Sequence, residues 1–353
     1  MRIRKEKDFV SCFDSDTGVY FRTGILKNGQ ETKADPFMAS FPELLDIGIM
    51  GHCIHGTSGL CVKAGVECYQ DGLNSQHDNM SLEDFECIIN QCKKDTYQIA
   101  LGGCGDPDQH EHFEEILKLC RAADIVPNFT TSGLGMTKDI AKLCKRYCGA
   151  VAVSWYRSQY TLEAINMLLQ AGVKTNIHYV LMNDSISEAE ERLLSDGFPK
   201  GINAVVFLLH KPVGLGTKEQ VITLDNSAFS SLLDCIYEKE FPFKIGFDSC
   251  TIPALVNRDT FNARFVDTCE AARWSAYISA DMKMMPCSFD NQGQRWSVDL
   301  KKKTISEAWY SLEFKEFRNY LKSSCPDCIK QKECMGGCPI CPEIVLCDKR
   351  EVR

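Results

Sequence analysis

The chain has 353 residues, of which 44% are apolar and 25% charged, a composition typical of a soluble globular protein with one large domain or two. Its formal net charge of −8 argues against general electrostatic binding to nucleic acid or to an anionic membrane surface. No run of about 18 apolar residues is present, and the opening "MRIRKEKDFVSCFDSD" turns acidic before any apolar signal segment. We therefore expect a cytoplasmic protein that binds neither nucleic acid nor membranes.

Cysteine is the unusual component of the composition, with 20 residues. Cytoplasmic thiols stay reduced, so metal ligation explains this number better than disulfides do. The cysteines are unevenly placed: three lie in the loop 51–72, and a dense group lies in the segment 325–347.

Residues 1–43 form an extended N-terminal segment in which short apolar stretches alternate with polar ones. The pair Asn28-Gly29 in "KNGQ" favours a tight hairpin turn, because both residues tolerate positive φ. We expect this segment to pack beside the following domain or to help recognise a substrate.

From residue 44 onward, apolar strands alternate with amphipathic helices. The predicted strands lie near 44–50, 97–103, 125–131, 150–155, 175–182 and 204–210, and the predicted helices near 81–94, 110–123, 137–147, 160–171, 186–196 and 226–239. Ser81 and Thr137 are good helix N-caps. This alternation predicts parallel βαβ crossovers in an α/β sheet or barrel of about 200 residues, with its chemistry at the carboxyl ends of the strands.

The loop "GHCIHGTSGLCVKAGVECYQDG" follows the first of these strands and contains Cys53, Cys61 and Cys68. A structural zinc site needs four protein ligands, whereas a [4Fe–4S] cluster held by three cysteines leaves one iron free for another ligand. The alternative is a zinc site completed by His52 or His55. At the end of the second strand, "LGGCGDP" places two glycines where a ligand can approach the backbone closely.

These motifs together resemble the radical S-adenosylmethionine (SAM) superfamily. The spacing C-x7-C-x6-C is longer than that family's usual C-x3-C-x2-C, but the "CY" ending is kept at Cys68-Tyr69. The resemblance implies that the free iron chelates the amino and carboxylate groups of SAM. It also implies that an electron from the cluster cleaves SAM, and that the resulting 5′-deoxyadenosyl radical abstracts a hydrogen atom from a substrate.

The resemblance also implies a set of SAM-binding residues. Gly102 and Gly103 correspond to the family's GGE motif, with Cys104 in place of the acid and Asp106 two residues on. The remaining candidates are strand residues and the residue after the third cysteine: Ser154, Asn176, His178 and Tyr69. Asn176 and His178 have the same side-chain direction, so both are expected to point into the barrel. A hydrogen-bonded core histidine is the alternative for His178.

The C-terminal segment "CPDCIKQKECMGGCPICPEIVLC" has the spacing C-x2-C-x5-C-x3-C and resembles the SPASM extension of radical SAM enzymes, which carries two auxiliary [4Fe–4S] clusters. Upstream, "CEAARWSAYISADMKMMPC" is similar to the other half of that signature, with Met282 in place of its glycine. A zinc ribbon is the alternative, since paired CxxC units bind zinc.

By this analogy each auxiliary cluster has four cysteine ligands, which suits electron transfer or shaping of the pocket. The first set is Cys250, Cys269, Cys287 and Cys338. The second set is Cys325, Cys328, Cys334 and Cys347, with Cys341 as the alternative to Cys347. Most of the other cysteines are expected to be small buried residues. Cys104 is the exception, because a thiol at the active edge can return a hydrogen atom to a substrate radical, as in some radical SAM epimerases.

The predicted architecture is therefore an α/β fold with an N-terminal extension (1–43), a partial (β/α)6 radical SAM barrel (44–245) and a small cysteine-rich SPASM-like domain (246–353). The resemblance implies SAM and three [4Fe–4S] clusters as cofactors, and an electron donor such as flavodoxin or ferredoxin. It implies an oxidoreductase that modifies a ribosomally made precursor peptide or small protein by crosslinking, epimerisation or oxidation. The alternatives are a radical SAM dehydrogenase of a small alcohol or sugar and a zinc-clustered interaction scaffold.

Overall fold

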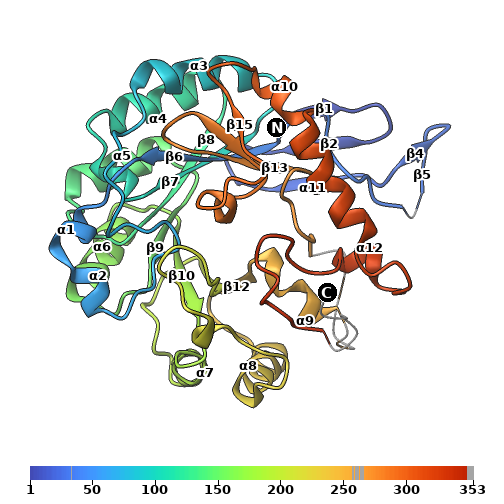
Figure 1. Ribbon diagram of the computed structural model, residues 1–353. Helices are drawn as coiled ribbons and strands as arrows, with labels where there is room; N and C mark the ends of the chain where they lie inside the picture. The colour runs from blue at the N-terminus through green and yellow to red at the C-terminus, as the bar shows by residue number, and fades with distance from the viewer. Residues whose placement is uncertain (33, 257, 259–261, 263–265, 348–353) are drawn as a thin grey trace.

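The computed structural model describes residues 1–32, 34–256, 258, 262 and 266–347. Its centre is a mostly parallel sheet with helices on its outer side (Figure 1). The consecutive parallel strands are β6 (Leu44–Met50), β7 (Gln98–Gly103), β8 (Val126–Thr131), β9 (Val151–Ser154), β10 (Thr175–Leu181), β11 (Ala204–Leu209) and β12 (Lys244–Phe247). All six predicted strands are present within two residues of their expected bounds, and β12 adds a seventh that the sequence pattern did not predict.

The six predicted helices are present as well and connect these strands. They are α3 (Leu82–Cys92), α4 (Phe113–Ala122), α5 (Lys138–Tyr147), α6 (Gln159–Gln170), α7 (Ile186–Leu194) and α8 (Ser227–Glu238). The predicted caps are confirmed, because Ser81 accepts a hydrogen bond from the Asp84 amide and Thr137 from the Ile140 amide. Within the described ranges, no helix has the length and hydropathy needed to cross a membrane.

The strand β6 illustrates how the sequence divides the two faces of the sheet. Leu45, Ile47 and Ile49 are fully buried in the hydrophobic core that the helices also line. Asp46 and Gly48 alternate with them and therefore face the opposite side, the interior of the barrel. One face of the strand thus stabilises the fold, and the other contributes to a cavity.

The C-terminal part of the chain extends the same sheet beyond β6. β13 (Ser275–Ile278) pairs in parallel with β6, and β14 (Lys283–Met285) and β15 (Val298–Asp299) follow in antiparallel order. Met282, in place of the SPASM glycine, has a φ of 67° beside the β13–β14 turn. The remaining helices of this part are α9 (Ile252–Leu255), α10 (Ile305–Trp309), α11 (Leu312–Ser323) and α12 (Gln331–Cys334).

The N-terminal segment forms two small antiparallel sheets. The first contains β1 (Arg2–Lys5), β2 (Val10–Phe13) and β3 (Tyr20–Arg22), and the second is the hairpin of β4 (Leu26–Lys27) and β5 (Gln30–Glu31). Asn28 and Gly29 have φ values of 53° and 76°, as the predicted tight turn requires. The predicted hairpin is therefore confirmed.

This segment is attached to the amino ends of the barrel strands. Glu43, directly before β6, is 5% exposed and accepts hydrogen bonds of 2.6 Å from the hydroxyls of Ser11 and Tyr20. Lys174, directly before β10, donates to the carbonyl of Thr17. The N-terminal segment therefore lies at the edge of the barrel opposite the carboxyl ends of the strands.

We expect Tyr20→Phe to lower the free energy of unfolding by about 1.5–3 kcal/mol, because it removes a hydrogen bond to a buried carboxylate. Urea unfolding under anaerobic conditions, followed by circular dichroism, measures this loss. The matched control is Tyr320→Phe on α11, where the side chain is exposed, and it should change stability by less than about 0.5 kcal/mol. Equal effects of the two substitutions would contradict the anchoring role of Glu43.

Candidate functional site

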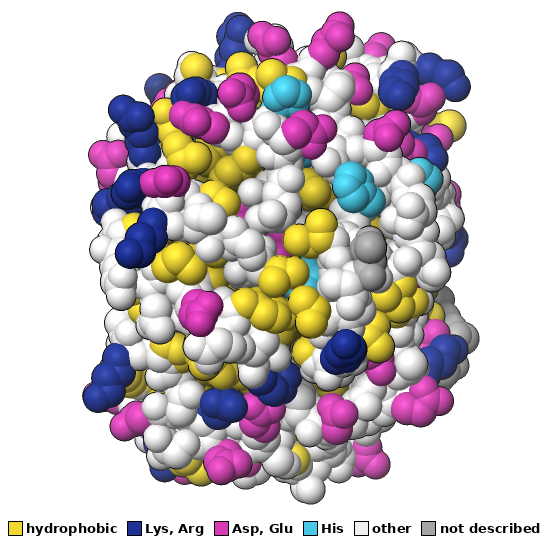
Figure 2. Space-filling model, turned by 90° about the vertical axis from the view of Figure 1, so that its left-hand side faces the viewer, with side chains coloured by type: hydrophobic (Ala, Val, Ile, Leu, Met, Phe, Trp, Pro, Cys, Tyr) yellow, Lys and Arg dark blue, Asp and Glu magenta, His cyan; other side chains and the backbone are white. Residues whose placement is uncertain are grey.

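A cavity of about 460 Å³ lies at the carboxyl ends of the barrel strands. It is lined by the loop after β6, by the ends of β7, β9, β10 and β11, and by Tyr277 and Phe289 from the C-terminal part. The loop contains two short helices, α1 (Ile54–Ser58) and α2 (Leu60–Lys63). Figure 2 shows the side of the molecule on which α1 and α2 lie in Figure 1, where hydrophobic side chains gather at the centre and most charged ones lie toward the margin.

The three cysteines of the loop all line this cavity. Cys53 precedes α1, Cys61 lies in α2 and Cys68 follows α2. A Cβ atom on Gly72 would lie 3.6 Å from the sulfurs of both Cys53 and Cys68, so the absence of a side chain at Gly72 keeps the space between these two thiols open. Burial raises the pKa of each of the three thiols. The loop therefore gathers the predicted sulfur ligands into one space.

The glycine pair at the end of β7 forms another wall of the cavity. Gly103 has a φ of 115°, and a Cβ atom there would meet the backbone of Met50 at 2.5 Å, so only glycine fits. A Cβ atom on Gly102 would meet nothing within 4 Å, which leaves the backbone at this position open to the cavity. The site thus offers main-chain groups to a ligand beside the three thiols.

A buried polar network ties the walls together. Both carboxylate oxygens of Asp106 accept hydrogen bonds from Ser132, one from its amide at 2.8 Å and one from its hydroxyl. His55 Nε2 contacts the Ser132 hydroxyl and lies 3.4 Å from Asp106. Asp106 therefore joins the loops after β6, β7 and β8, and it also lines the cavity.

His178 lines the cavity as predicted, and its Nδ1 lies 3.3 Å from the Thr130 hydroxyl. Burial lowers the pKa of His178 to about 4, so its imidazole is neutral at physiological pH. Ser154, at the end of β9, also lines the cavity.

Asn176, predicted to contact SAM, is not among the residues that line this cavity. It lies two residues before His178, about 7 Å nearer the amino end of the strand. Its amide oxygen accepts a hydrogen bond of 2.7 Å from Asn203. Alternation along the strand identified the correct face for Asn176 but did not identify the depth of its side chain in the barrel.

Tyr69 and Cys104 complete the predicted set. The ring of Tyr69 lies 4.8 Å from that of Phe289, and both residues line the cavity. Cys104 is 8% exposed, and its thiol donates to the carbonyl of Gln70 at 3.3 Å. Burial raises the pKa of Cys104 to about 11, so this thiol keeps its hydrogen at neutral pH.

The cavity wall also contains charged residues to which the sequence analysis assigned no role. Lys211 forms a buried ion pair with Asp248 at the cavity wall. Burial opposes the charged form of Lys211, but Asp248 and the nearby thiols of Cys250 and Cys338 outweigh it and raise the lysine pKa. Asp46 lines the cavity, its carboxylate accepts no hydrogen bond from another described residue, and burial raises the pKa of this carboxylate to about 6. The single polar side chain within "LLDIGIM" was the available signal for Asp46.

The first C-terminal set of cysteines (Cys250, Cys269, Cys287 and Cys338) lies close to Lys211. The thiols of Cys250, Cys269 and Cys338 all act electrostatically on the thiol of Cys287, whose pKa is raised by burial. Cys250 and Cys338 are in side-chain contact, and the amide of Cys341 donates to the sulfur of Cys338 at 3.3 Å. The structure therefore brings together cysteines that are up to 88 positions apart in the sequence, Cys250 and Cys338.

The second set lines a small cavity of about 30 Å³ in the C-terminal part. Its cysteines are Cys325, Cys328, Cys334 and Cys347, whereas Cys341 is buried outside it. Neither set, nor any other group of three or more His, Cys, Asp or Glu side chains in the described ranges, is arranged to hold a single metal ion.

No protein-family model matches the chain, and no curated protein matches it in sequence. Its fold, however, is similar to that of solved structures. SuiB from Streptococcus suis bound to S-adenosylmethionine has a TM-score of 0.64 and 16% identity, and the match covers 86% of this chain and 74% of SuiB. Native anSMEcpe with bound AdoMet has a TM-score of 0.62 and 16% identity, covering 87% of this chain and 92% of that one. At this identity the likeness establishes the fold, and the predicted α/β fold with a large, mostly parallel sheet is confirmed.

The neutral state of His178 predicts a pH dependence of stability. Between pH 6.5 and 4 the unfolded chain binds a proton on this residue that the folded protein does not, so stability falls as the pH is lowered. We expect His178→Gln to remove about 1 kcal/mol of the stability lost between pH 7.5 and 5.5, measured by urea unfolding.

Asp46 and Asp108 have raised pKa values and oppose this trend, but they are common to the native protein and the variant. His77→Gln, at an exposed histidine, is the matched control and should leave the native pH dependence in place. An unchanged pH dependence in His178→Gln would show that the imidazole is charged or solvated in the folded protein.

Proposed function

We propose that this chain is a radical SAM enzyme that removes a hydrogen atom from a peptide substrate. The observation that carries the proposal is that three cysteine thiols and the open backbone of Gly102 face one cavity at the carboxyl ends of the barrel strands. The fold it shares with two proteins solved with SAM bound supports this assignment. Fold alone does not define an activity, so the donor set carries the argument.

The residues of the cavity fit the proposed cofactors. Cys53, Cys61 and Cys68 would hold a [4Fe–4S] cluster with one open iron, and the Gly102-Gly103 backbone would receive the SAM amino group. When bound, the cluster and SAM would together supply the electron and the 5′-deoxyadenosyl radical for hydrogen abstraction. The protein provides the orientation and the exclusion of water.

The other cavity residues prepare the site for this chemistry. Neutral His178 offers a hydrogen bond without introducing a charge beside the reacting carbon. Val180 and Leu208 supply apolar surface that limits access of water. The protonated thiol of Cys104 holds a hydrogen atom at the cavity wall that a substrate radical could take up, which favours epimerisation among the peptide modifications. The S–H bond would break as the substrate C–H bond forms, and the resulting Cys104 thiyl radical would return to the thiol with one electron from a proposed auxiliary cluster and one proton.

We further propose that the two C-terminal sets hold two auxiliary [4Fe–4S] clusters, so that the protein carries three in total. Lys211 lines the cavity and lies close to Cys250 and Cys338, so the Lys211–Asp248 ion pair would stand next to the first auxiliary cluster. A reduced flavodoxin or ferredoxin would supply electrons to the cluster of the three-cysteine loop.

A peptide substrate is supported by the same structural comparisons. SuiB has been solved with its precursor peptide SuiA, at a TM-score of 0.65 and 17% identity over 86% of this chain and 73% of SuiB. anSMEcpe has been solved with both AdoMet and a peptide bound.

The decisive experiment is the iron and sulfide content of anaerobically purified protein, combined with an assay for 5′-deoxyadenosine. We expect about twelve irons per chain, falling to about eight with loss of SAM cleavage when Cys53, Cys61 and Cys68 are all changed to alanine. Cys87→Ala, at an exposed cysteine, is the control and should keep both. Zinc in place of iron, or SAM cleavage by the triple variant, would refute the proposed function.

The ligand of the second auxiliary cluster is tested by two single substitutions. Cys347→Ala should lower the iron content by up to about four per chain, because it removes a thiol from the small C-terminal cavity. Cys341→Ala, at a buried cysteine outside that cavity, should keep the iron of the native protein. The reverse pattern would assign Cys341 as the ligand.

A further inference from the structure

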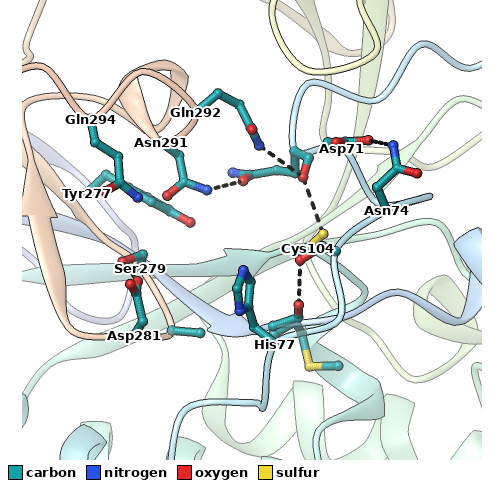
Figure 3. A pocket seen from close by; sticks show the side chains of 15 residues that line it. Asp71, Asn74, His77, Cys104, Tyr277, Ser279, Asp281, Asn291, Gln292 and Gln294 are labelled. Carbon is teal, nitrogen blue, oxygen red and sulfur yellow. Dashed lines mark hydrogen bonds between the residues drawn. The ribbon is translucent and has the colours of Figure 1, made fainter.

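A second cavity of about 290 Å³ lies beside the main one (Figure 3). It is formed by the segment after Cys68 and by the C-terminal segments that follow β13 and β14. We call it the side cavity. Gln70, Cys104 and Tyr277 line both cavities, so these three side chains separate the proposed SAM site from the side cavity.

Gln70 has hydrogen-bonding capacity that the described residues leave unused. It is 4% exposed, and its side-chain oxygen accepts a hydrogen bond of 3.0 Å from Asn291. Its side-chain nitrogen is buried and makes no hydrogen bond of normal geometry with the described residues, and the hydroxyls of Tyr69 and Tyr277 lie near the Gln70 side chain. An unpaired buried donor costs about 1–3 kcal/mol, which a ligand with a carbonyl oxygen would recover.

Tyr277 provides a second donor at the same wall. A side chain on Gly48 would collide with the Tyr277 hydroxyl, so the glycine is what allows the phenol to enter the barrel. Burial raises the pKa of Tyr277, which keeps the hydroxyl protonated. Gln70 and Tyr277 thus place two neutral donors next to the thiol of Cys104.

The rim of the side cavity is polar and carries acidic groups. Its exposed members are Asn74, His77, Asp281, Gln292 and Gln294. Asp71 is half-buried, and its carboxylate accepts a hydrogen bond of 2.7 Å from Asn74. No lysine or arginine is among the described residues that line this cavity. Amide side chains can bond a peptide backbone in both directions. Asp281 forms an ion pair of 3.1 Å with Lys283, whereas Asp71 has no ion pair among the described residues, so Asp71 is the rim carboxylate that favours basic over acidic neighbours.

We propose that the side cavity binds the part of a peptide substrate that flanks the reacting residue, and that this part is neutral or basic. The inference rests on the proposed function, because it takes the substrate to be a peptide. The peptide carbonyl groups accept from Gln70 and Tyr277, and basic side chains lie toward Asp71. A chain bound in this way reaches the main cavity past Cys104, the thiol proposed to return a hydrogen atom.

Peptide binding tests the proposal without turnover. The probes are fluorescein-labelled octapeptides of Gly, Ser and Asn that contain two arginines, two glutamates or no charged residue. They are titrated with the cluster-loaded protein in the presence of SAM and the absence of reductant, and binding is measured by fluorescence anisotropy. We expect the arginine probe to bind at least about fivefold more tightly than the glutamate probe, with the neutral probe between them.

Asp281→Lys should abolish or reverse this preference, because it replaces an acidic rim group with a cation. Glu316→Lys makes the same charge change on exposed α11, outside the side cavity, and is the matched control. Gln292→Leu should weaken all three probes by removing an amide without changing the charge. The proposal is overturned if the two lysine variants behave alike, if the glutamate probe binds best to the native protein, or if no probe binds.

The SAM-cleavage assay on the native protein separates failure of this proposal from failure of the proposed function. Cleavage without probe binding refutes the side cavity as a peptide site and leaves the radical SAM assignment intact. Absence of cleavage in a protein with a full complement of iron refutes the function itself, whatever the probes do.

Discussion

The parallel pairing of β6 with β7 on one side and with β13 on the other is the constraint on which the rest of the site depends. Because the strands are parallel, the segments after them all begin at the same edge of the sheet. Gly48 lies opposite Gly102, and Asp46 lies opposite Tyr277. The three-cysteine loop, the glycine pair and a C-terminal tyrosine therefore meet, although they come from three distant parts of the sequence.

The same pairing joins the C-terminal part to the barrel. Trp309 and Phe317 belong to the same buried hydrophobic cluster as Leu45 and Phe85, so the core is continuous across both parts. The C-terminal thiols come from segments with little regular structure, where few backbone hydrogen bonds order the chain. Clusters bound by these thiols would supply that order, since ligation that closes long loops stabilises the folded state.

The two cavities differ in chemistry in a way that suits their proposed roles. Cysteine sulfurs, glycine backbone, apolar side chains, neutral His178, Asp46 and the Lys211–Asp248 ion pair surround the main cavity. Amides and carboxylates surround the side cavity. Cys104 lies at the boundary, close enough to solvent-facing polar groups for a peptide to reach it and buried enough to remain a thiol. A reactive radical is best kept on the apolar side of such a boundary.

The sequence by itself determined the local elements: six strands, six helices, their caps, the hairpin turn at Asn28-Gly29 and the three-cysteine loop. These follow from periodicity and turn chemistry within a few residues. Only the tertiary structure decided the depth of Asn176, the pairing of Lys211 with Asp248, and which of the last two cysteines faces the small C-terminal cavity. It also decided the entry of Tyr277 into the barrel. Each of these depends on contacts between separate segments of the chain, which carry no periodic signal in the sequence.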